Sequence, residues 1–376
     1  MLEKLQNLPF IRKLDHHMHE VLRGASIAFV MKSLGGVLDF GVNVALARML
    51  GAEGAGVFFL ALSITTIATV FGRMGLDNTF LRFTAASAAV GDWKSLKGMY
   101  RKGLMVAATA SLTTSVTMFA FSPWVAENIF GKPELAQPVR WMSLAVLPLA
   151  LQILHAELLK GLKRILASTF LQEHGVGLSS LTLLGIFLLS RTWGVYGAIG
   201  AVVIAATAMA ATGAFLWWKW TPELRETSGH FDTKELLQSS LPLFWVASMN
   251  LVMNWTGSFS LGIWGTNADV GVFNLAARTA LLTSVILVAI NSIVAPKFAG
   301  LYRLGDMEAL GKVARNSTKL MTFFAAPILL VFLIFPKLIM YIFGPSMVEH
   351  WPILVVLALG QFVCASSGSA GYLLMM

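Results

Sequence analysis

The chain has 376 residues and a net charge of +9, and 56% of its residues are hydrophobic while only 12% are charged. Ordinary soluble domains carry about 25% charged residues, so this composition excludes a soluble globular enzyme and indicates a membrane protein. The excess of Lys and Arg does not indicate nucleic-acid binding, because most of these residues lie in short segments between apolar runs.

Apolar segments recur along the whole chain, and each is long enough to cross a hydrocarbon core of about 30 Å as a helix. Ten spans are predicted, at residues 25–47, 56–73, 103–124, 139–159, 166–190, 193–217, 239–263, 271–295, 318–343 and 351–374. Basic residues concentrate in the N-terminal tail and in alternate loops, which the positive-inside rule assigns to the cytoplasm. We therefore predict an all-α polytopic membrane protein with a cytoplasmic N-terminus.

Two sequence motifs occur twice. "GAEGAGVFFLALS" at 51–63 matches "GTNADVGVFNLAAR" at 265–278, and "GDWKSLKGMYRK" at 91–102 matches "GDMEALGKVARN" at 305–316. We interpret the glycines of the first motif as a tight turn between the first two helices, because no lysine follows them as in a phosphate-binding loop.

The repeat predicts two tandem helical bundles. Six predicted helices precede the second copy, so the halves have the same orientation and form a parallel repeat. The predicted divisions are the cytoplasmic tail 1–24, a six-helix bundle 25–217, a cytoplasmic linker 218–238 and a second bundle 239–376. The second bundle has only four predicted helices, so we expect it to be truncated.

The chain resembles a known family in three segments, "LARMLGAEGAGVFFLAL", "RMGLDNTFLRF" and "INSIVAPKFAGLYRLGDMEAL". They are similar to bacterial lipopolysaccharide and polysaccharide (O-antigen-type) flippases of the multidrug, oligosaccharidyl-lipid and polysaccharide exporter superfamily. The resemblance implies a V-shaped cavity between two bundles, more spans than the ten predicted, and a location in the bacterial inner membrane. It also implies that a lipid-linked oligosaccharide is the substrate, with membrane lipids and polysaccharide polymerase or assembly proteins as partners.

Polar residues inside predicted spans are the candidates for function, because a charge at the bilayer centre costs about 2.5–3.5 kcal/mol even on lenient scales. The first span carries one polar helical face, made of Lys32, Gly36, Asp39 and Asn43. The seventh span repeats this pattern with Asn250, Asn254 and Ser258. We expect both stripes to line the cavity. Lys32 and Asp39 are a stabilising charge pair, or groups that bind substrate or couple to protons, or residues that lie at the lipid interface.

Arg278 is the strongest candidate for contact with a phosphate, because its guanidinium is always charged and can bind an oxyanion in bidentate fashion. Asn274 lies one turn away on the same face, and the span that contains Arg278 has no acidic partner for it. The alternative is that Arg278 extends toward the outer headgroups, since a predicted loop is about two turns away.

Two further groups of charged residues are predicted to act in transport. Glu157 in the fourth span, and Glu173 with His174 in the fifth, are candidate proton-coupling groups. Pairing of Glu157 with a nearby lysine is the alternative. The cytoplasmic mouth of the cavity is predicted to carry cations that either meet the diphosphate first or cap helices and anchor them at the headgroups, namely Arg73, Arg82 and Lys297.

The sequence contains no motif of an enzyme, such as an Asp-x-Asp pair, a Gly-x-x-x-x-Gly-Lys loop or a His-Glu-x-x-His helix. Three histidines in "LDHHMHE" at 14–20 lack the ligand set of a zinc site. We therefore predict a transporter without a cofactor or metal: a flippase for lipid-diphosphate-linked oligosaccharide that works by alternating access. The alternatives are a multidrug or small-molecule exporter of the same fold, and a non-functional truncated copy or membrane scaffold.

Overall fold

The computed structural model describes residues 16–368, apart from 173, 226, 230, 232 and most positions between 285 and 305. Within this part every regular element is a helix. Seven of these helices are long and apolar enough to cross a membrane. The prediction of an all-α polytopic membrane protein is therefore confirmed.

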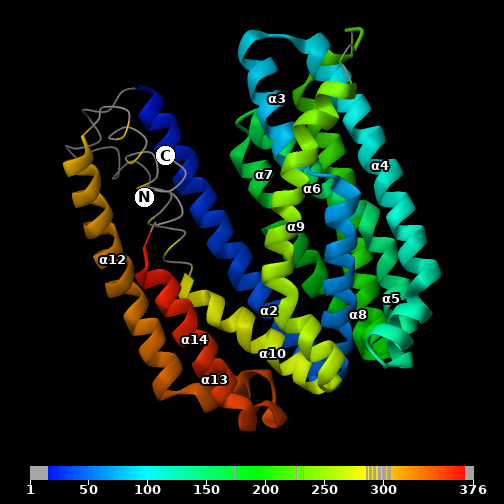
Figure 1. Cartoon of the computed structure of the whole chain (residues 1–376), viewed down its shortest axis with the longest axis vertical. Helices are drawn as coiled ribbons and strands as arrows, with labels where there is room; N and C mark the ends of the chain where they lie inside the picture. Colours follow the sequence, from blue (N-terminus) through cyan, green and yellow to red (C-terminus); the bar gives the residue numbers. More distant parts are fainter. Residues whose placement is uncertain are drawn as a thin grey trace.

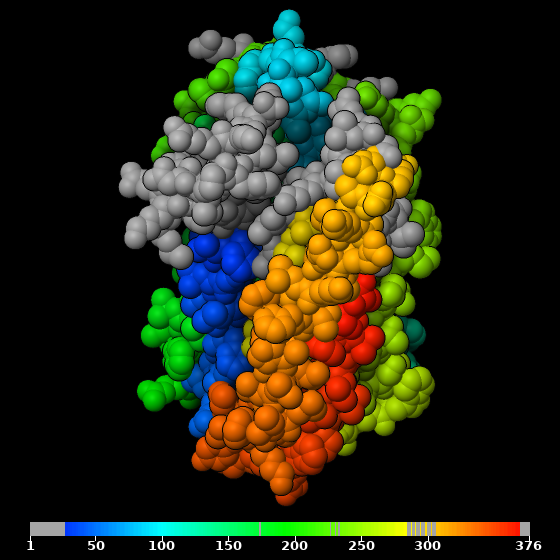
Figure 2. All heavy atoms as spheres, turned by 90° about the vertical axis from the view of Figure 1, so that its left-hand side faces the viewer, coloured from blue at the N-terminus to red at the C-terminus, as the bar shows by residue number. Residues whose placement is uncertain are grey.

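The helices form two groups that lie apart at one end of the molecule and meet at the other (Figure 1). The larger group contains α2 (His16–Arg73), α3 (Leu76–Val90), α4 (Trp93–Trp124), α5 (Ala136–Met142), α6 (Val146–Gly161), α7 (Ile165–Leu171), α8 (Val176–Trp220) and α9 (Thr233–Trp264). The smaller contains α12 (Met307–Ile334), α13 (Pro336–Phe343) and α14 (Trp351–Ser366), and α10 (Asn267–Ala280) connects the two groups. Short turns of 3₁₀ or π helix lie between consecutive helices of the chain, at Val125–Ile129, Pro133–Leu135, Ser143–Ala145, Pro222–Leu224, Leu281–Ser284 and Pro345–His350. In the side view, α12 and α14 lie next to each other on the face toward the viewer (Figure 2).

Two of the long helices reverse direction at a glycine. α2 turns at Gly51 (φ 70°) and α8 turns at Gly194 (φ 54°), and a positive φ is a conformation that glycine adopts far more readily than other residues. A Cβ on Gly185 would lie 2.7 Å from the side chain of Ala201. Residues this far apart cannot touch in a straight helix, so the two arms of α8 pack against each other. Each of these helices therefore supplies two of the predicted spans.

Two predicted spans are wrong in detail. The span at 166–190 is interrupted, because Gln172 and Gly175 have extended backbones with ψ values of 163° and 157° between α7 and α8. The span at 318–343 is two helices, because Pro336 restricts Phe335, which precedes it, and begins α13. The predicted span 271–295 begins in α10 and continues into residues outside the described part.

The repeated Gly-Asp motifs have the same local structure. Asp92 accepts a hydrogen bond from the Ser95 amide at 3.0 Å, and Asp306 accepts one from the Ala309 amide at 2.9 Å. The backbone angles of the two aspartates are also alike, at −81°, 74° and −82°, 76°. Each motif is thus an N-cap that begins a long membrane helix, α4 or α12. The segment 73–102, which lies between two predicted spans, is mostly helical, because it contains α3 and the beginning of α4.

The repeated Gly-Val-Phe motifs cross each other at backbone contact. A Cβ on Gly56, in the second arm of α2, would lie 1.6 Å from the carbonyl oxygen of Asn267. A Cβ on Gly271, in α10, would lie 2.1 Å from the carbonyl oxygen of Ala52. Each glycine thus faces the residue four positions before the other glycine, which is the contact expected for two elements related by a two-fold rotation. Only Gly51 makes the turn that the sequence had suggested for the whole cluster.

A second set of contacts ties the same end of the molecule together. The Arg48 guanidinium, next to the Gly51 turn, donates hydrogen bonds from Nε to the Ile342 carbonyl at 2.8 Å and from Nη2 to the Tyr341 carbonyl at 3.2 Å. The side-chain amide of Asn267 donates a hydrogen bond from Nδ2 to the Glu134 carboxylate at 2.9 Å. These polar contacts join α2 to α13, and α10 to the turn before α5, so this end is closed by packing and hydrogen bonds.

Candidate functional site

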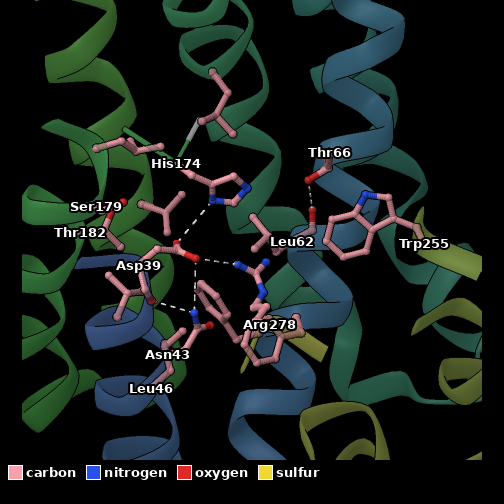
Figure 3. Close-up of a pocket in the computed structure, with 16 residues that line it drawn as sticks. Asp39, Asn43, Leu46, Leu62, Thr66, His174, Ser179, Thr182, Trp255 and Arg278 are labelled. Carbon is pink, nitrogen blue, oxygen red and sulfur yellow. Dashed lines mark hydrogen bonds and ion pairs between the residues drawn. The ribbon is translucent and has the colours of Figure 1, made fainter. Parts of the chain in front are cut away.

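A pocket lies between the two arms of α2 and is also lined by α9, by α10 and by the beginning of α8 (Figure 3). We call it the central pocket. It holds about 720 Å³ of atom-free space, including its open mouth. Aliphatic and aromatic side chains make most of its wall, and the polar residues that line it are Asp39, Asn43, Thr66, His174, Ser179, Thr182 and Arg278. A mostly apolar cavity with a few convergent polar groups is the usual form of a ligand site.

Asp39 is the centre of the polar cluster in this pocket. Its Oδ2 lies 3.5 Å from Nη1 of Arg278, and its Oδ1 lies 3.5 Å from Nδ1 of His174. Asn43 Nδ2 donates to the Asp39 carbonyl at 2.7 Å and lies 3.4 Å from the carboxylate. One carboxylate therefore connects α2 with α10 and with the segment before α8 (Figure 3).

A glycine on α2 positions His174. A Cβ on Gly35 would lie 2.3 Å from the His174 carbonyl oxygen, so only glycine allows the backbone between α7 and α8 to approach the helix here. Asp39 is one turn further along α2, which places its carboxylate beside the imidazole. His174 was predicted to lie within a helix, but it lies in the break between α7 and α8.

Arg278 is held by α10 and by an aromatic ring. Its guanidinium lies 5.2 Å from the centroid of the Phe59 ring, within the range of a cation–π contact. Its side chain is only 20% exposed and faces Asp39 (Figure 3). The guanidinium therefore points into the central pocket, and the headgroup contact considered from the sequence is not the one that the structure shows.

A capping box begins α10 and so fixes the helix that presents Arg278. Thr266 accepts a hydrogen bond from the Asp269 amide at 3.2 Å, and the Asp269 carboxylate accepts from the Thr266 amide at 2.8 Å and the Thr266 hydroxyl at 2.7 Å. This reciprocal pair satisfies donors that the first turn of a helix leaves free.

We expect Asp269→Ala to lower the free energy of unfolding by about 1 kcal/mol at pH 7. Hydrogen bonds from the Thr266 amide and hydroxyl hold the pKa of this carboxyl below its usual range. The stabilisation is therefore present above the unfolded-state pKa of about 3.9 and is lost as the pH falls through the lower folded-state pKa. Thermal unfolding of wild type and variant as a function of pH would test this, and a difference that grows toward low pH would contradict it.

The remaining predicted residues of the two stripes lie elsewhere. Lys32 is exposed and is close enough to Glu157 and Lys160 to interact with both charges. Asn250 and Asn254 are exposed outside the central pocket, and each donates to a carbonyl of its own helix. Their roles in substrate binding stay predictions.

Asn274 and Glu157 have partners within the fold. Asn274 is buried, donates to the Val270 carbonyl at 2.9 Å and accepts from Ser258 at 3.1 Å, so it joins α9 to α10. Glu157 forms an ion pair with Lys160 at 3.1 Å, the pairing considered as its alternative. Substrate binding by Asn274 and proton coupling by Glu157 stay predictions.

The predicted mouth residues lie near α3 and α9. Arg73 pairs with Asp77 at 2.6 Å, and Arg82 lies over the Phe83 ring, with Ser239 of α9 at 3.4 Å from its Nη2. Glu173 and Lys297, the other candidates from the sequence, lie outside the described residues. Contact of these residues with substrate stays a prediction.

Sequence reasoning missed the aromatic wall of the central pocket, which contains Phe58, Phe59 and Trp255. The signal was present for two of them, because Phe58 ends the repeated Gly-Val-Phe motif and Phe59 follows it. Gly56 packs against α10, and the two phenylalanines that follow it in the chain line the central pocket.

An all-helical membrane fold with a charged pocket enclosed by its helices is typical of transporters and flippases. The chain belongs to the polysaccharide biosynthesis protein family, whose model matches residues 21–301. The relationship expected from the three sequence segments is thereby confirmed.

Relatives and solved structures agree with this assignment. Stage V sporulation protein B of Bacillus subtilis (strain 168) is 26% identical over 140 residues, which are 37% of this chain and 26% of that protein. A multidrug resistance MATE family transporter of the MOP superfamily, in an inward-facing conformation, matches with a TM-score of 0.67 and 17% identity over 93% of this chain and 85% of its own. The lipid II flippase MurJ, in an inward closed conformation, matches with a TM-score of 0.67 and 14% identity over 92% and 77%. The two TM-scores show that this chain shares the fold of these transporters.

Proposed function

We propose that this protein is a flippase that moves a lipid-diphosphate-linked oligosaccharide, a precursor of surface polysaccharide, across the bacterial inner membrane by alternating access. The observation that carries the proposal is the Arg278–Asp39 pair inside the central pocket, at 3.5 Å. The family supports a role in polysaccharide synthesis. Likeness to a lipid II flippase supports a lipid-linked substrate.

The pocket suits the polar part of such a substrate. Arg278 presents a planar set of donors that fits a phosphate oxyanion. Asn43, Ser179 and Thr182 add short polar side chains that can hydrogen-bond sugar hydroxyls. The isoprenoid tail stays in the bilayer, reached through the open mouth of the pocket, because burying a long alkyl chain among charged groups has no energetic advantage.

Asp39 is the counter-anion of Arg278 in this structure, at 3.5 Å. A diphosphate that binds Arg278 competes with this carboxylate, since the two anions would otherwise repel each other at short distance. His174, at 3.5 Å on the other side of Asp39, can carry a proton and offset the displaced charge. In this proposal Asp39 and His174 couple substrate binding to protonation.

The proposed orientation places the basic segments and the N-terminus in the cytoplasm. Polysaccharide assembly proteins then receive the product on the outer side of the membrane.

Deletion of the gene from a bacterium that makes surface polysaccharide tests the proposal. We expect surface glycan to be lost and lipid-linked sugar to accumulate on the cytoplasmic face of the membrane. The wild-type gene should restore the surface glycan and remove the accumulated lipid-linked sugar. Unchanged surface glycan without accumulation would refute the flippase assignment.

Export of a cationic amphiphile is a second candidate, because one carboxylate stands beside aromatic rings in the same pocket. Asp39 and Trp255 line the wall, and such a site attracts organic cations. Cells that extrude a cationic dye, and lose extrusion with Asp39→Asn while Arg278→Gln retains it, would favour this function. Loss of glycan translocation with Arg278→Gln would favour the flippase.

A further inference from the structure

A second pocket lies where the beginning of α4 meets the segment between α8 and α9. We call it the linker pocket, and it shares no residue with the central pocket. It holds about 920 Å³ of atom-free space, including its open side. The residues that line it are Gly98, Arg101, Lys102, Met105, Val106 and Gly229.

The floor of the linker pocket is backbone. A Cβ on Gly229 would lie 2.9 Å from the Gly98 amide nitrogen, so the linker approaches α4 where both residues lack side chains. Two lysines of α4 hold the linker in place: Lys97 donates to the Thr227 carbonyl at 2.6 Å, and Lys102 donates to the Phe231 carbonyl at 2.7 Å. These ammonium groups are partly engaged in fixing the shape of the pocket.

Arg101 is the cation that this arrangement leaves available. It is exposed, it lines the linker pocket, and it makes no hydrogen bond or ion pair with the residues that the structure describes. A guanidinium beside a second positive charge, that of Lys102, binds a phosphate group more readily than it binds a single carbonyl.

The face of α4 that follows Arg101 in the chain is apolar and exposed. Met105 is 60% exposed, and Leu112, Val116 and Phe119 are exposed further along α4. Their spacing of seven, four and three residues places them on one helical face, continuous with Arg101. In a membrane helix such a face contacts acyl chains, so one stripe of α4 runs from a cation at the membrane boundary to a surface that lies along lipid.

We propose that the linker pocket binds the headgroup of an anionic phospholipid, with its phosphate on Arg101 and Lys102 and its acyl chains along the Met105 face of α4. The lipid would hold the linker against α4 and so stabilise the connection between α8 and α9. A phosphate supplied by a soluble ester, or by the lipid-linked sugar itself, is the competing source of the same chemistry.

The test is lipid binding to the purified full-length protein in detergent, measured by native mass spectrometry. Phosphatidylglycerol and phosphatidylcholine with identical acyl chains are titrated separately. We expect one phosphatidylglycerol molecule to bind with high affinity and Arg101→Gln to weaken this binding about tenfold, as for loss of one charge-assisted hydrogen bond. Lys312→Gln, which removes an exposed charge from α12, is the matched control and should bind as wild type does.

Several results would overturn the proposal. Equal affinity for phosphatidylcholine, equal weakening by Lys312→Gln, or unchanged binding to Arg101→Gln would each show that the pocket does not select the lipid. Displacement of the lipid by glycerol 1-phosphate at similar concentration would assign the pocket to a soluble phosphate. Arg278→Gln should leave phosphatidylglycerol binding unchanged, so the outcome is independent of the proposed flippase activity.

Discussion

Replacement of Arg278 by glutamine is expected to lower translocation of the lipid-linked sugar by about a hundredfold, because the substrate would lose two charge-assisted hydrogen bonds. The change also leaves Asp39, at 3.5 Å from Arg278 in the wild type, without its cation. Translocation is measured in the complemented deletion strain as surface glycan per molecule of flippase, with membrane abundance determined in parallel.

Three variants distinguish substrate contact from stability. Arg278→Lys keeps the charge but not the planar fork, so we expect a partial defect. Asp39→Asn removes the competing carboxylate, so we expect tighter binding of the diphosphate but slower turnover. Arg191→Gln, which removes an exposed arginine from α8 away from the pocket, is the control. Wild-type flux in Arg278→Gln would show that this residue does not contact substrate.

The periodicity of α2 predicted part of the candidate site. Asp39 and Asn43 do line the central pocket, as their shared helical face indicated. Arg278 stood out because its own span lacks an acid, but its partner could not be read from the sequence. The Asp39–Arg278 contact joins positions far apart in the chain, and only the packing of α2 against α10 brings them together.

Periodicity alone could not say which face of a helix turns inward. Asn250 and Asn254 form a polar stripe like that of the first span, yet they are exposed outside the central pocket. The break that exposes His174 was also hidden, since apolar residues continue on both sides of it. Gly175 and Gly177 were the local signal, because paired glycines weaken a helix in that segment.

The repeated glycines show how a correct pattern can receive an incomplete interpretation. The Gly-Val-Phe match was visible in the sequence, and we interpreted the cluster as a turn. In the structure Gly51 makes the turn, whereas Gly56 and Gly271 allow two helices to cross. A sequence match reports that two positions have the same requirement. It does not report whether that requirement is a backbone angle or the absence of a side chain.

Gly56→Ala is expected to disrupt the end of the molecule where α2 crosses α10. The added Cβ would lie 1.6 Å from the Asn267 carbonyl oxygen, and a backbone atom cannot move aside as a flexible side chain can. Forcing the helices apart should cost about 3 kcal/mol, the upper range for overpacking. Gly360→Ala in α14 is the control, since nothing lies within 4 Å of the added methyl group. It should be neutral or stabilising by up to about 1 kcal/mol, because alanine favours the helix.

The consequence for transport follows from the position of this crossing. Alternating access requires the closed end of the central pocket to open, and the Gly56 contact and the Arg48 hydrogen bonds to α13 hold that end shut. Gly56→Ala should therefore favour the opened conformation in molecules that still fold. Leu46 lines the central pocket and is buried. The Leu46→Cys variant, in a Cys364→Ser background, should then react faster with a membrane-impermeant thiol reagent than it does with Gly56 intact. If the variant and the protein with Gly56 intact had equal thiol reactivity and equal unfolding temperatures, the added methyl group would not separate α2 from α10. Other contacts would then hold the closed end shut.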